Sequence, residues 1–229
     1  MSLPSFMKGI LALSVAGVLS GCAAVPVLMA TAVGTTAAVS TDRRTFGAQV
    51  ADSTMEKRIT VEIQEKIKEG MHLTVTSYNR WVLLTGEVNT QTKKEIAGEV
   101  ARKSLEVNRV FNELAVMEPV EFSQRFSDST LATKIRTSII ATSDVYLNQI
   151  KITVDRGNVY IMGMVTQSEA DILVDKISHT SGVKSVVKAF EVLSKSEIEK
   201  RMKFIKGVDV QQNDGSAGKE SASSEVWLN

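Results

Sequence analysis

The sequence predicts an α+β fold: two tandem αββαβ domains, each a three-stranded mixed sheet covered by two helices. Two observations predict it. Patterns of apolar residues recur once within the 229 residues, and both copies carry the same helix and hairpin signals in the same order. Gly86 and Val88, for example, recur 77 positions later as Gly163 and Val165. Each copy is about 70 residues long, enough for a small domain with its own core.

Each copy opens with an amphipathic helix whose apolar residues are four apart, as Ile59 and Ile63 are in the first copy. Ser53 and Glu56 have the spacing of a capping box, which predicts that the first helix begins near residue 53. Asp128 is a suitable N-cap for the corresponding helix of the second copy, which is therefore expected to start near this residue.

A hairpin follows the first helix in both copies. Asn79 in the first turn and Gly157 in the second tolerate the positive φ that such turns require. A second helix and a final strand close each copy, and capping residues predict that these helices begin near residue 90 and at Thr166. The predicted strands are 73–77, 81–88 and 109–116 in the first copy, and 150–154, 159–165 and 184–192 in the second.

The N-terminus has the features of a secretory signal that is cleaved before a lipid-modified cysteine. Lys8 precedes an apolar run at 9–19, which is shorter than the about 20 residues that a helix needs to cross a bilayer. The tetrapeptide at 19–22 resembles the bacterial lipobox, so Cys22 is the expected lipidation site. The next residue is Ala23. Lipoproteins of this type that lack an aspartate at this position are usually sent to the outer membrane, so the resemblance implies an outer-membrane address with the mature protein facing the periplasm. Two or three acyl chains on Cys22 would make this attachment practically permanent.

These signals divide the chain into five parts. The predicted parts are a signal peptide at 1–21, a lipidated tether at 22–50, the first domain at 51–118, the second domain at 125–194, and a C-terminal part at 195–229. The C-terminal part is expected to contain a charged helix and, from residue 211, a disordered tail.

Composition and residue types argue against several classes of function. The formal net charge is +1 and no basic stripe is visible, so nucleic acid is not an expected partner. One cysteine excludes an internal disulfide and a cysteine-based zinc site, and the two histidines, His72 and His179, fall in different copies. No phosphate-binding loop or dinucleotide motif is present, and nothing marks a nucleophile and a base together. We therefore expect no enzyme activity, no catalytic residue, no metal and no cofactor.

The lipobox, an Ala- and Thr-rich tether and two αββαβ units, each with a glycine inside a strand, resemble the dual BON-domain lipoproteins. Further segments that carry the resemblance are 41–44, 133–136, 142–144, 162–166 and 181–184. Within this family the chain is most similar to lipid-binding members of the outer membrane. The resemblance implies a non-enzymatic protein that binds anionic phospholipid and helps to keep the outer membrane intact.

The resemblance also implies that the first helix of the second domain contacts the membrane. With Leu131, Ile135 and Ile139 facing the core, the helical period places the other residues outward. The expected membrane-binding residues are Phe126, Thr130, Thr133, Lys134, Arg136, Thr137 and Ile140. An apolar side chain and cations on an otherwise polar face suit an anionic membrane surface.

Two departures from the family bear on this expectation. The family has a membrane-facing tryptophan where this chain has Thr130, and Phe126, one turn earlier, is the candidate to insert in its place. Residues 105–107 of the first domain are Leu-Glu-Val, whereas the corresponding residues 181–183 of the second domain are Ser-Gly-Val. The first domain is therefore expected to diverge more from the family and to have a structural role.

Two hypotheses from different classes follow. In the first, the protein binds an anionic phospholipid membrane. In the second, it is an adaptor that docks a periplasmic protein, such as an envelope-assembly or cell-wall factor. Charge reversal of Lys134 and Arg136 should abolish lipid binding, whereas an adaptor should tolerate it and depend on an exposed sheet edge. An enzyme, the third class, would require a pocket with convergent polar groups.

Overall fold

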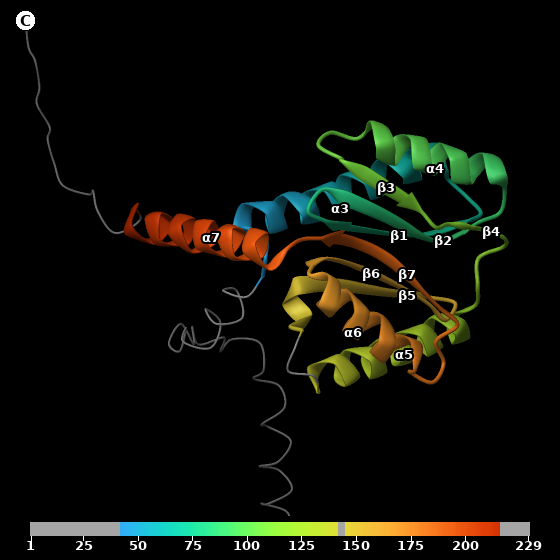
Figure 1. Ribbon diagram of the computed structural model, residues 1–229. Helices are drawn as coiled ribbons and strands as arrows, with labels where there is room; N and C mark the ends of the chain where they lie inside the picture. Colours follow the sequence, from blue (N-terminus) through green and yellow to red (C-terminus); the bar gives the residue numbers. More distant parts are fainter. Residues whose placement is uncertain (1–41, 142–144, 216–229) are drawn as a thin grey trace, which may run out of the picture. The chain divides into compact units, whose positions relative to one another are not determined.

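The computed structural model describes residues 42–141 and 145–215, which belong to one compact unit, Ser40–Asn229 (Figure 1). The predicted signal peptide, Cys22 and the tail beyond residue 215 lie outside the described residues. Within the described ranges, no helix has the length and apolar composition needed to cross a membrane.

Two domains with the same order of elements follow each other along the chain. The first contains α3 (Phe46–Lys66), β1 (Met71–Tyr78), β2 (Trp81–Val88), α4 (Gln91–Lys103), β3 (Arg109–Asn112) and β4 (Ala115–Val116). The second contains α5 (Phe122–Ile140), the 3₁₀ turn η1 (Leu147–Gln149), β5 (Ile150–Asp155), β6 (Asn158–Val165), α6 (Gln167–Ser178) and β7 (Ser185–Val192), and α7 (Lys195–Gly215) follows it. In each sheet the central strand is antiparallel to the strand before it and parallel to those after it. The predicted α+β fold is confirmed.

Each pair of helices packs on one face of its own sheet. In the first domain Ile59 and Ile63 of α3 are fully buried with Leu84 of β2. In the second, Ile135 of α5 and Leu173 of α6 occupy the corresponding core. These residues belong to the apolar positions that recur at helical spacing in the sequence, so this spacing correctly predicted which helix faces are buried.

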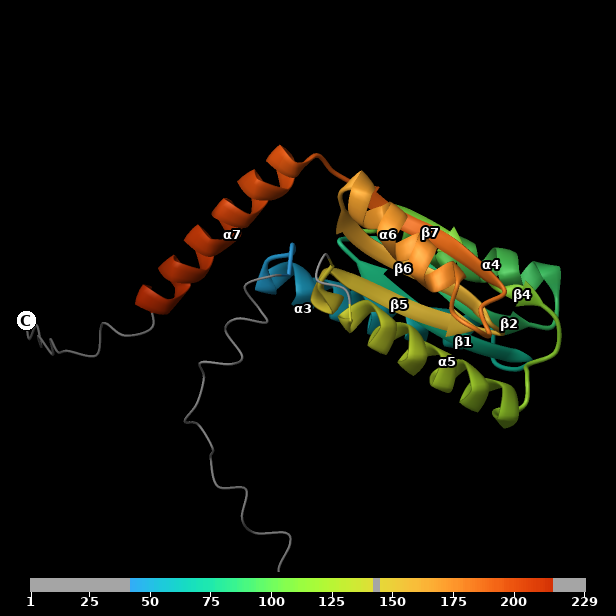
Figure 2. The same ribbon diagram turned by 60° about the horizontal axis from the view of Figure 1, so that its bottom comes forward.

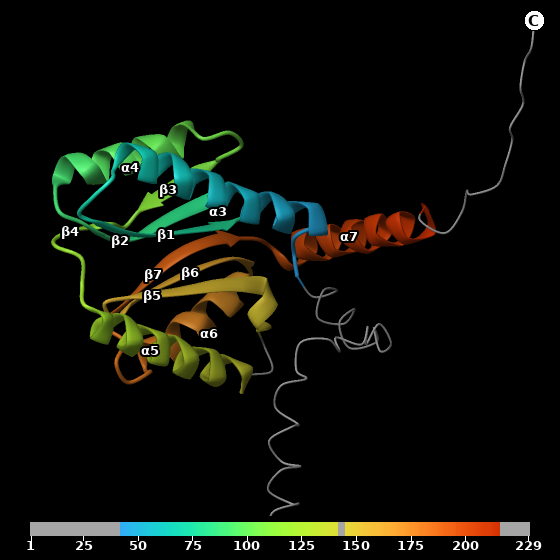
Figure 3. The same ribbon diagram turned by 180° about the vertical axis from the view of Figure 1, so that it is seen from behind.

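The opposite faces of the two sheets pack against each other. Leu83 of β2 is buried in one cluster with Tyr160 and Met162 of β6. Beside this cluster β1 lies next to β5, where the hydroxyl oxygens of Thr76 and Thr153 are 3.2 Å apart. The helices therefore lie outside the paired sheets, as Figures 1 and 3 show.

The first helix of the first domain begins earlier than predicted. Thr45 caps it, since its hydroxyl accepts a backbone N–H of the first turn at 3.1 Å. The predicted capping box is wrong, because Ser53 lies inside the helix and its hydroxyl donates to the carbonyl oxygen of Gln49. Helix α3 thus starts within the stretch 22–50 that was expected to be tether.

The first helix of the second domain also begins earlier, at Phe122. The predicted cap, Asp128, is buried inside this helix, and its carboxylate accepts the backbone N–H groups of Arg156 and Gly157 at 2.8 and 2.9 Å. Asp52 holds the β1–β2 turn of the first domain in the same way. The prediction for Asp128 was wrong because this acid binds a hairpin turn that is distant in sequence and does not cap the start of its own helix.

Caps and turns that depend only on local sequence are confirmed. Thr90 caps α4, and Thr166 with Glu169 forms the capping box of α6. Asn79 has a φ of 50° and Gly157 a φ of 78° in the two hairpin turns. In these places the partners of each residue lie within a few positions, so the sequence predicts them well.

Two elements near the domain ends differ from the prediction. The last strand of the first domain is split into β3 and β4 at Leu114, which turns into the core and is 1% exposed. Helix α7 continues to Gly215, so residues 211–215 are helical and their predicted disorder is wrong.

Residues 42–44, which we call the strap, join the two domains ahead of α3. Arg44 pairs with Asp52 of the first domain at 3.0 Å. Arg43 reaches the second domain, where its guanidinium donates to both carboxylate oxygens of Glu169 at 2.7 and 2.8 Å and to the carbonyl oxygen of Met164 at 2.6 Å. Burial alone would raise the pKa of Glu169, but the bonds from Arg43 prevail and lower it.

Two further ion pairs connect the domains. Lys151 pairs with Glu56 at 2.7 Å, and Arg156 pairs with Glu87 at 3.3 Å. Glu87 is fully buried, and this burial, together with the carboxylate of Asp155, raises its pKa despite the cations nearby.

Candidate functional site

The expected membrane-binding residues lie on α5, whose inner face belongs to the core. Leu131, Ile135 and Ile139 are buried against the sheet of the second domain. With 3.6 residues per turn, the opposite face of the helix is turned outward. Figures 1 and 2 show α5 along the outside of its domain, with no described helix or strand over this outer face.

All seven expected residues are exposed. The large apolar ones, Phe126 and Ile140, are 66% and 68% exposed. Phe122, one turn before Phe126, lies on the same face and is 78% exposed. It was not predicted, because the helix was expected to start at Asp128. We call Phe122, Phe126 and Ile140 the α5 row; at about 1.5 Å per residue it extends over about 27 Å.

The threonine hydroxyls along this face are already used within the helix. Thr130, Thr133 and Thr137 each donate to the carbonyl oxygen four residues earlier, at 3.0 Å. A hydroxyl that keeps its hydrogen bond costs less to remove from water than a free one. The outer face of α5 is therefore less polar than its composition suggests.

Cations lie on both sides of the α5 row. At about 100° per residue, Lys134 is on one flank and Arg125 and Arg136 are on the other, so the two predicted cations are separated and not clustered. Arg125 donates to the carbonyl oxygen of Val120 at 2.8 Å and Arg136 to that of Ile152 at 3.3 Å. Arg125 was not predicted, again because the helix was expected to start after it.

A cavity opens on each flank of α5. The Lys134 cavity has a volume of about 430 Å³, and its lining includes Phe126, Thr130, Lys134, Gly157, Gly182 and Lys184. The Arg136 cavity has a volume of about 420 Å³, and its lining includes His72, Thr74, Arg125, Asp128, Arg136 and Asp155. The α5 row thus lies between the Lys134 cavity and the Arg136 cavity, both of which have polar linings.

The histidines and acidic residues do not converge on a metal centre. Across residues 42–141 and 145–215, no group of three or more His, Cys, Asp or Glu side chains could hold a metal ion. His72 of β1 lies 3.3 Å from Glu87, and His179 at the end of α6 lies 3.3 Å from Asp175. Each histidine thus has an acidic neighbour within its own domain.

The repeated αββαβ unit is that of a known family. The family model of the BON domain matches residues 55–118 and 127–194, so this chain belongs to the BON-domain family and carries two such domains. Both matches fall within the predicted ranges 51–118 and 125–194.

Two relatives are similar to this chain over most of their own length. It is 37% identical to the outer membrane lipoprotein DolP of Haemophilus influenzae over 159 residues, which are 69% of this chain and 82% of that protein. It is 29% identical to a 21 kDa hemolysin of Actinobacillus pleuropneumoniae over 149 residues, 64% of this chain and 77% of that one. The chain therefore belongs to the same dual BON-domain family as the outer membrane lipoprotein DolP, as expected.

The likeness to solved structures is weak. A structural protein of the Type III secretion system of Chlamydia trachomatis aligns with 62% of this chain and 96% of its own, at 10% identity and a TM-score of 0.28. This likeness is too low to bear on the fold or the function.

Proposed function

We propose that this protein binds anionic phospholipid membranes through its second BON domain, and that it supports envelope integrity in this way. The α5 row carries the proposal. Three large apolar side chains are exposed along one helix face, with cations on both sides. Isolated apolar residues are normal on a protein surface, but an exposed row rimmed by polar groups is typical of an interaction site.

The energies favour contact in the plane of the membrane interface. Full transfer of a phenylalanine side chain out of water contributes about 1.5–3 kcal/mol, and each cation near an anionic surface adds about 1 kcal/mol. Apolar side chains exposed at such an interface enter the headgroup region, and cations beside them face the anionic lipids. The α5 row and its flanking cations supply both contributions.

The second part of the proposal is the anchor, in which Cys22 carries acyl chains and the domains face the periplasm. A lipid anchor would keep α5 close to the membrane and raise its effective concentration there. We expect a Cys22→Ser variant to leave the outer-membrane fraction of the cell, because the thiol that receives the lipid is gone. Retention of this variant in that fraction would contradict the anchor.

Binding by α5 is tested without the anchor, using a fragment that comprises Ser40–Asn229. This compact unit contains the strap and the three buried clusters of the described residues. Co-sedimentation would be measured with phosphatidylcholine vesicles that contain or lack phosphatidylglycerol. We expect Phe126→Ser to weaken binding to the anionic vesicles about tenfold, the equivalent of about 1.4 kcal/mol.

A matched control is Phe204→Ser in α7, since Phe204 is 65% exposed and Phe126 is 66% exposed. The control should bind as the unaltered fragment does. A second variant, Lys134→Glu with Arg136→Glu, should lose the preference for anionic vesicles. Equal sedimentation with both kinds of vesicle, or an equal loss in the Phe204 control, would overturn the proposal.

The adaptor hypothesis has one observation in its favour. Strand β7, Ser185–Val192, is at the edge of its sheet, and in the described ranges no strand pairs with its outer side. A partner peptide could add to such an edge by main-chain hydrogen bonds. An adaptor would keep its activity in cells when Lys134 and Arg136 are reversed, whereas a lipid-binding protein would lose it; survival in sodium dodecyl sulfate would report this difference.

A further inference from the structure

We propose that the Lys134 cavity is a subsite for the phosphate group of an anionic phospholipid headgroup, and that Lys184, which lies outside α5, is one of its two cations. The inference rests on the proposed function and adds a site with a defined chemistry beside the helix. Resemblance and sequence pattern pointed only to residues of α5, whereas this cavity combines three separate elements.

Three elements hold the cavity in shape. They are α5, the β5–β6 turn, and the loop between α6 and β7 that carries Gly182 and Lys184. A Cβ added at Gly157 of the turn would lie 3.2 Å from Cγ and Cδ of Lys184, and one at Gly182 would lie 3.4 Å from Leu131 of α5. Both glycines have positive φ, 78° and 105°. The loop therefore packs closely on the turn and the helix, and the stem of Lys184 lies against the turn.

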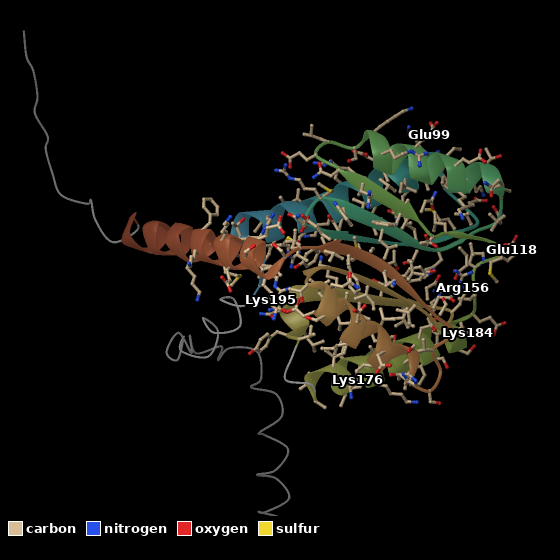
Figure 4. The ribbon with its side chains drawn as sticks, in the orientation of Figure 1. Glu99, Glu118, Arg156, Lys176, Lys184 and Lys195 are labelled. Atoms are coloured by element: carbon tan, nitrogen blue, oxygen red, sulfur yellow. The ribbon has the colours of Figure 1, made fainter. Side chains whose placement is uncertain are left out.

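Figure 4 places Lys184 beside Arg156, at the turn end of the second domain. This is where Asp128 fixes the turn to α5 through the N–H groups of Arg156 and Gly157. The position of Lys184 is thus set by a rigid part of the fold, which a recognition site requires.

The charge of the cavity favours an anion. Lys134 and Lys184 both line it, and within the described residues neither has an ion pair or a side-chain hydrogen bond. The single acidic side chain in the lining, Asp128, is already bonded to two backbone N–H groups and to the amide of Gln124 at 3.2 Å. Two cations and one carboxylate give a formal charge of +1. An ammonium group forms short, strong hydrogen bonds with phosphate oxygens.

The Arg136 cavity does not have this balance. Its two arginines, Arg125 and Arg136, face two carboxylates in the same lining, Asp128 and Asp155. Its formal charge is zero, so it offers no comparable attraction for a phosphate.

The apolar side of the Lys134 cavity explains why a lipid headgroup fits better than a free anion. Phe126 lines the cavity and is also part of the α5 row. A phosphate held by Lys134 and Lys184 would have this ring beside it, directed toward the layer that contains the acyl chains. The cavity and the row would then bind two parts of one lipid.

The first test uses lysine variants of the Ser40–Asn229 fragment with the phosphatidylglycerol vesicles. We expect Lys184→Gln to weaken binding about fivefold, as loss of one cation near an anionic surface would, and Lys184→Arg to restore it. Lys188→Gln is the matched control, because this exposed lysine lies on β7, the strand that follows Lys184, about 13 Å further along at about 3.3 Å per residue. Its binding should stay unchanged.

The second test separates the headgroup from a free phosphate. Backbone amide NMR signals of Gly157 and Gly182 would be followed during titration with glycerol 3-phosphate and with inorganic phosphate. We expect saturable shifts with glycerol 3-phosphate, smaller ones with inorganic phosphate, and neither in Lys184→Gln. Equal shifts with both ligands would overturn recognition of a headgroup in favour of a site for phosphate alone.

The outcomes distinguish this inference from the proposed function. If Lys184→Gln binds anionic vesicles normally while Phe126→Ser does not, the inference is overturned and the proposed function stands. Equal losses in Lys184→Gln and Lys188→Gln would indicate diffuse surface charge and would also overturn it. If the unaltered fragment does not bind anionic vesicles but its glycine signals shift with glycerol 3-phosphate, the membrane proposal is overturned and the cavity is a site for soluble phosphate esters.

Discussion

At the scale of single residues, one buried aspartate in each domain joins a helix to a hairpin. Asp52 of α3 and Asp128 of α5 each accept two backbone N–H groups from the turn between the first two strands. Turn N–H groups that point inward need an acceptor, because an unpaired buried donor is costly. A carboxylate on the adjacent helix supplies this acceptor, and the arrangement occurs once in each of the two domains.

Replacement of this carboxylate should destabilise the second domain. We expect Asp128→Ala to lower the free energy of unfolding by about 2–3 kcal/mol, because it leaves two turn N–H groups without their acceptor. Urea denaturation of the Ser40–Asn229 fragment measures this. Asp171→Ala is the control: Asp171 is exposed on α6 and, among the described residues, its side chain bonds to the side chain of Gln167 alone, so its loss should cost no more than about 0.5 kcal/mol. Equal effects of the two substitutions would show that Asp128 does not hold the turn.

At the scale of elements, the strands and their turns could be predicted from the sequence because their determinants are local. The glycine that recurs inside the central strand has a different cause, a contact with a neighbouring backbone segment. Gly86 has a φ of 114°, and a Cβ there would clash with the carbonyl oxygen of His72 on β1. At Gly163 a Cβ would lie 2.8 Å from the carbonyl oxygen of Gln149. Each glycine therefore allows a neighbouring backbone to approach the central strand closely, which explains why it recurs within a strand.

Helix α5 could be predicted only in part from the sequence. Its outward face was predicted correctly, since a period of 3.6 residues needs no tertiary information. Its start was not, because the partners of Asp128 are 28 and 29 residues away. The error concealed Phe122, the most exposed of the three residues in the α5 row. The Lys134 cavity could not be predicted either, because it forms only when the loop carrying Lys184 packs against the turn and the helix.

At the scale of the whole molecule, the pairing of the two sheets had a signal in the sequence. The central strands β2 and β6 are buried on both faces, and their segments 82–84 and 159–162 contain consecutive apolar residues where a half-exposed strand would alternate. Such runs indicate a strand covered on both sides. The pattern does not identify the covering element, and here each sheet covers the other.

The strap had no such signal, since Arg43 and its partner Glu169 are 126 residues apart. Nevertheless it contacts both domains, since Arg44 pairs with Asp52 and Arg43 reaches Glu169. Arg43 bonds to both oxygens of Glu169 in a partly buried place and to the carbonyl oxygen of Met164 in a buried one. The strap precedes the first helix, so the chain that leads from the tether reaches the second domain before it enters the first.

We therefore expect Arg43→Gln to destabilise the Ser40–Asn229 fragment by about 3 kcal/mol at neutral pH, because it leaves Glu169 unpaired in a largely buried place. Since Arg43 lowers the pKa of Glu169 in the folded state, the ion pair stabilises the fold above the ordinary carboxyl pKa, and this contribution is lost as the pH falls through the lowered value. The difference in unfolding free energy between the two proteins should be full above about pH 5 and should shrink toward about pH 3. Lys103→Gln, which removes the exposed ion pair with Glu99, should show neither the loss nor the pH dependence. A difference for Arg43→Gln that stays constant across this range would mean that the arginine stabilises the domain pair by packing and not by its charge.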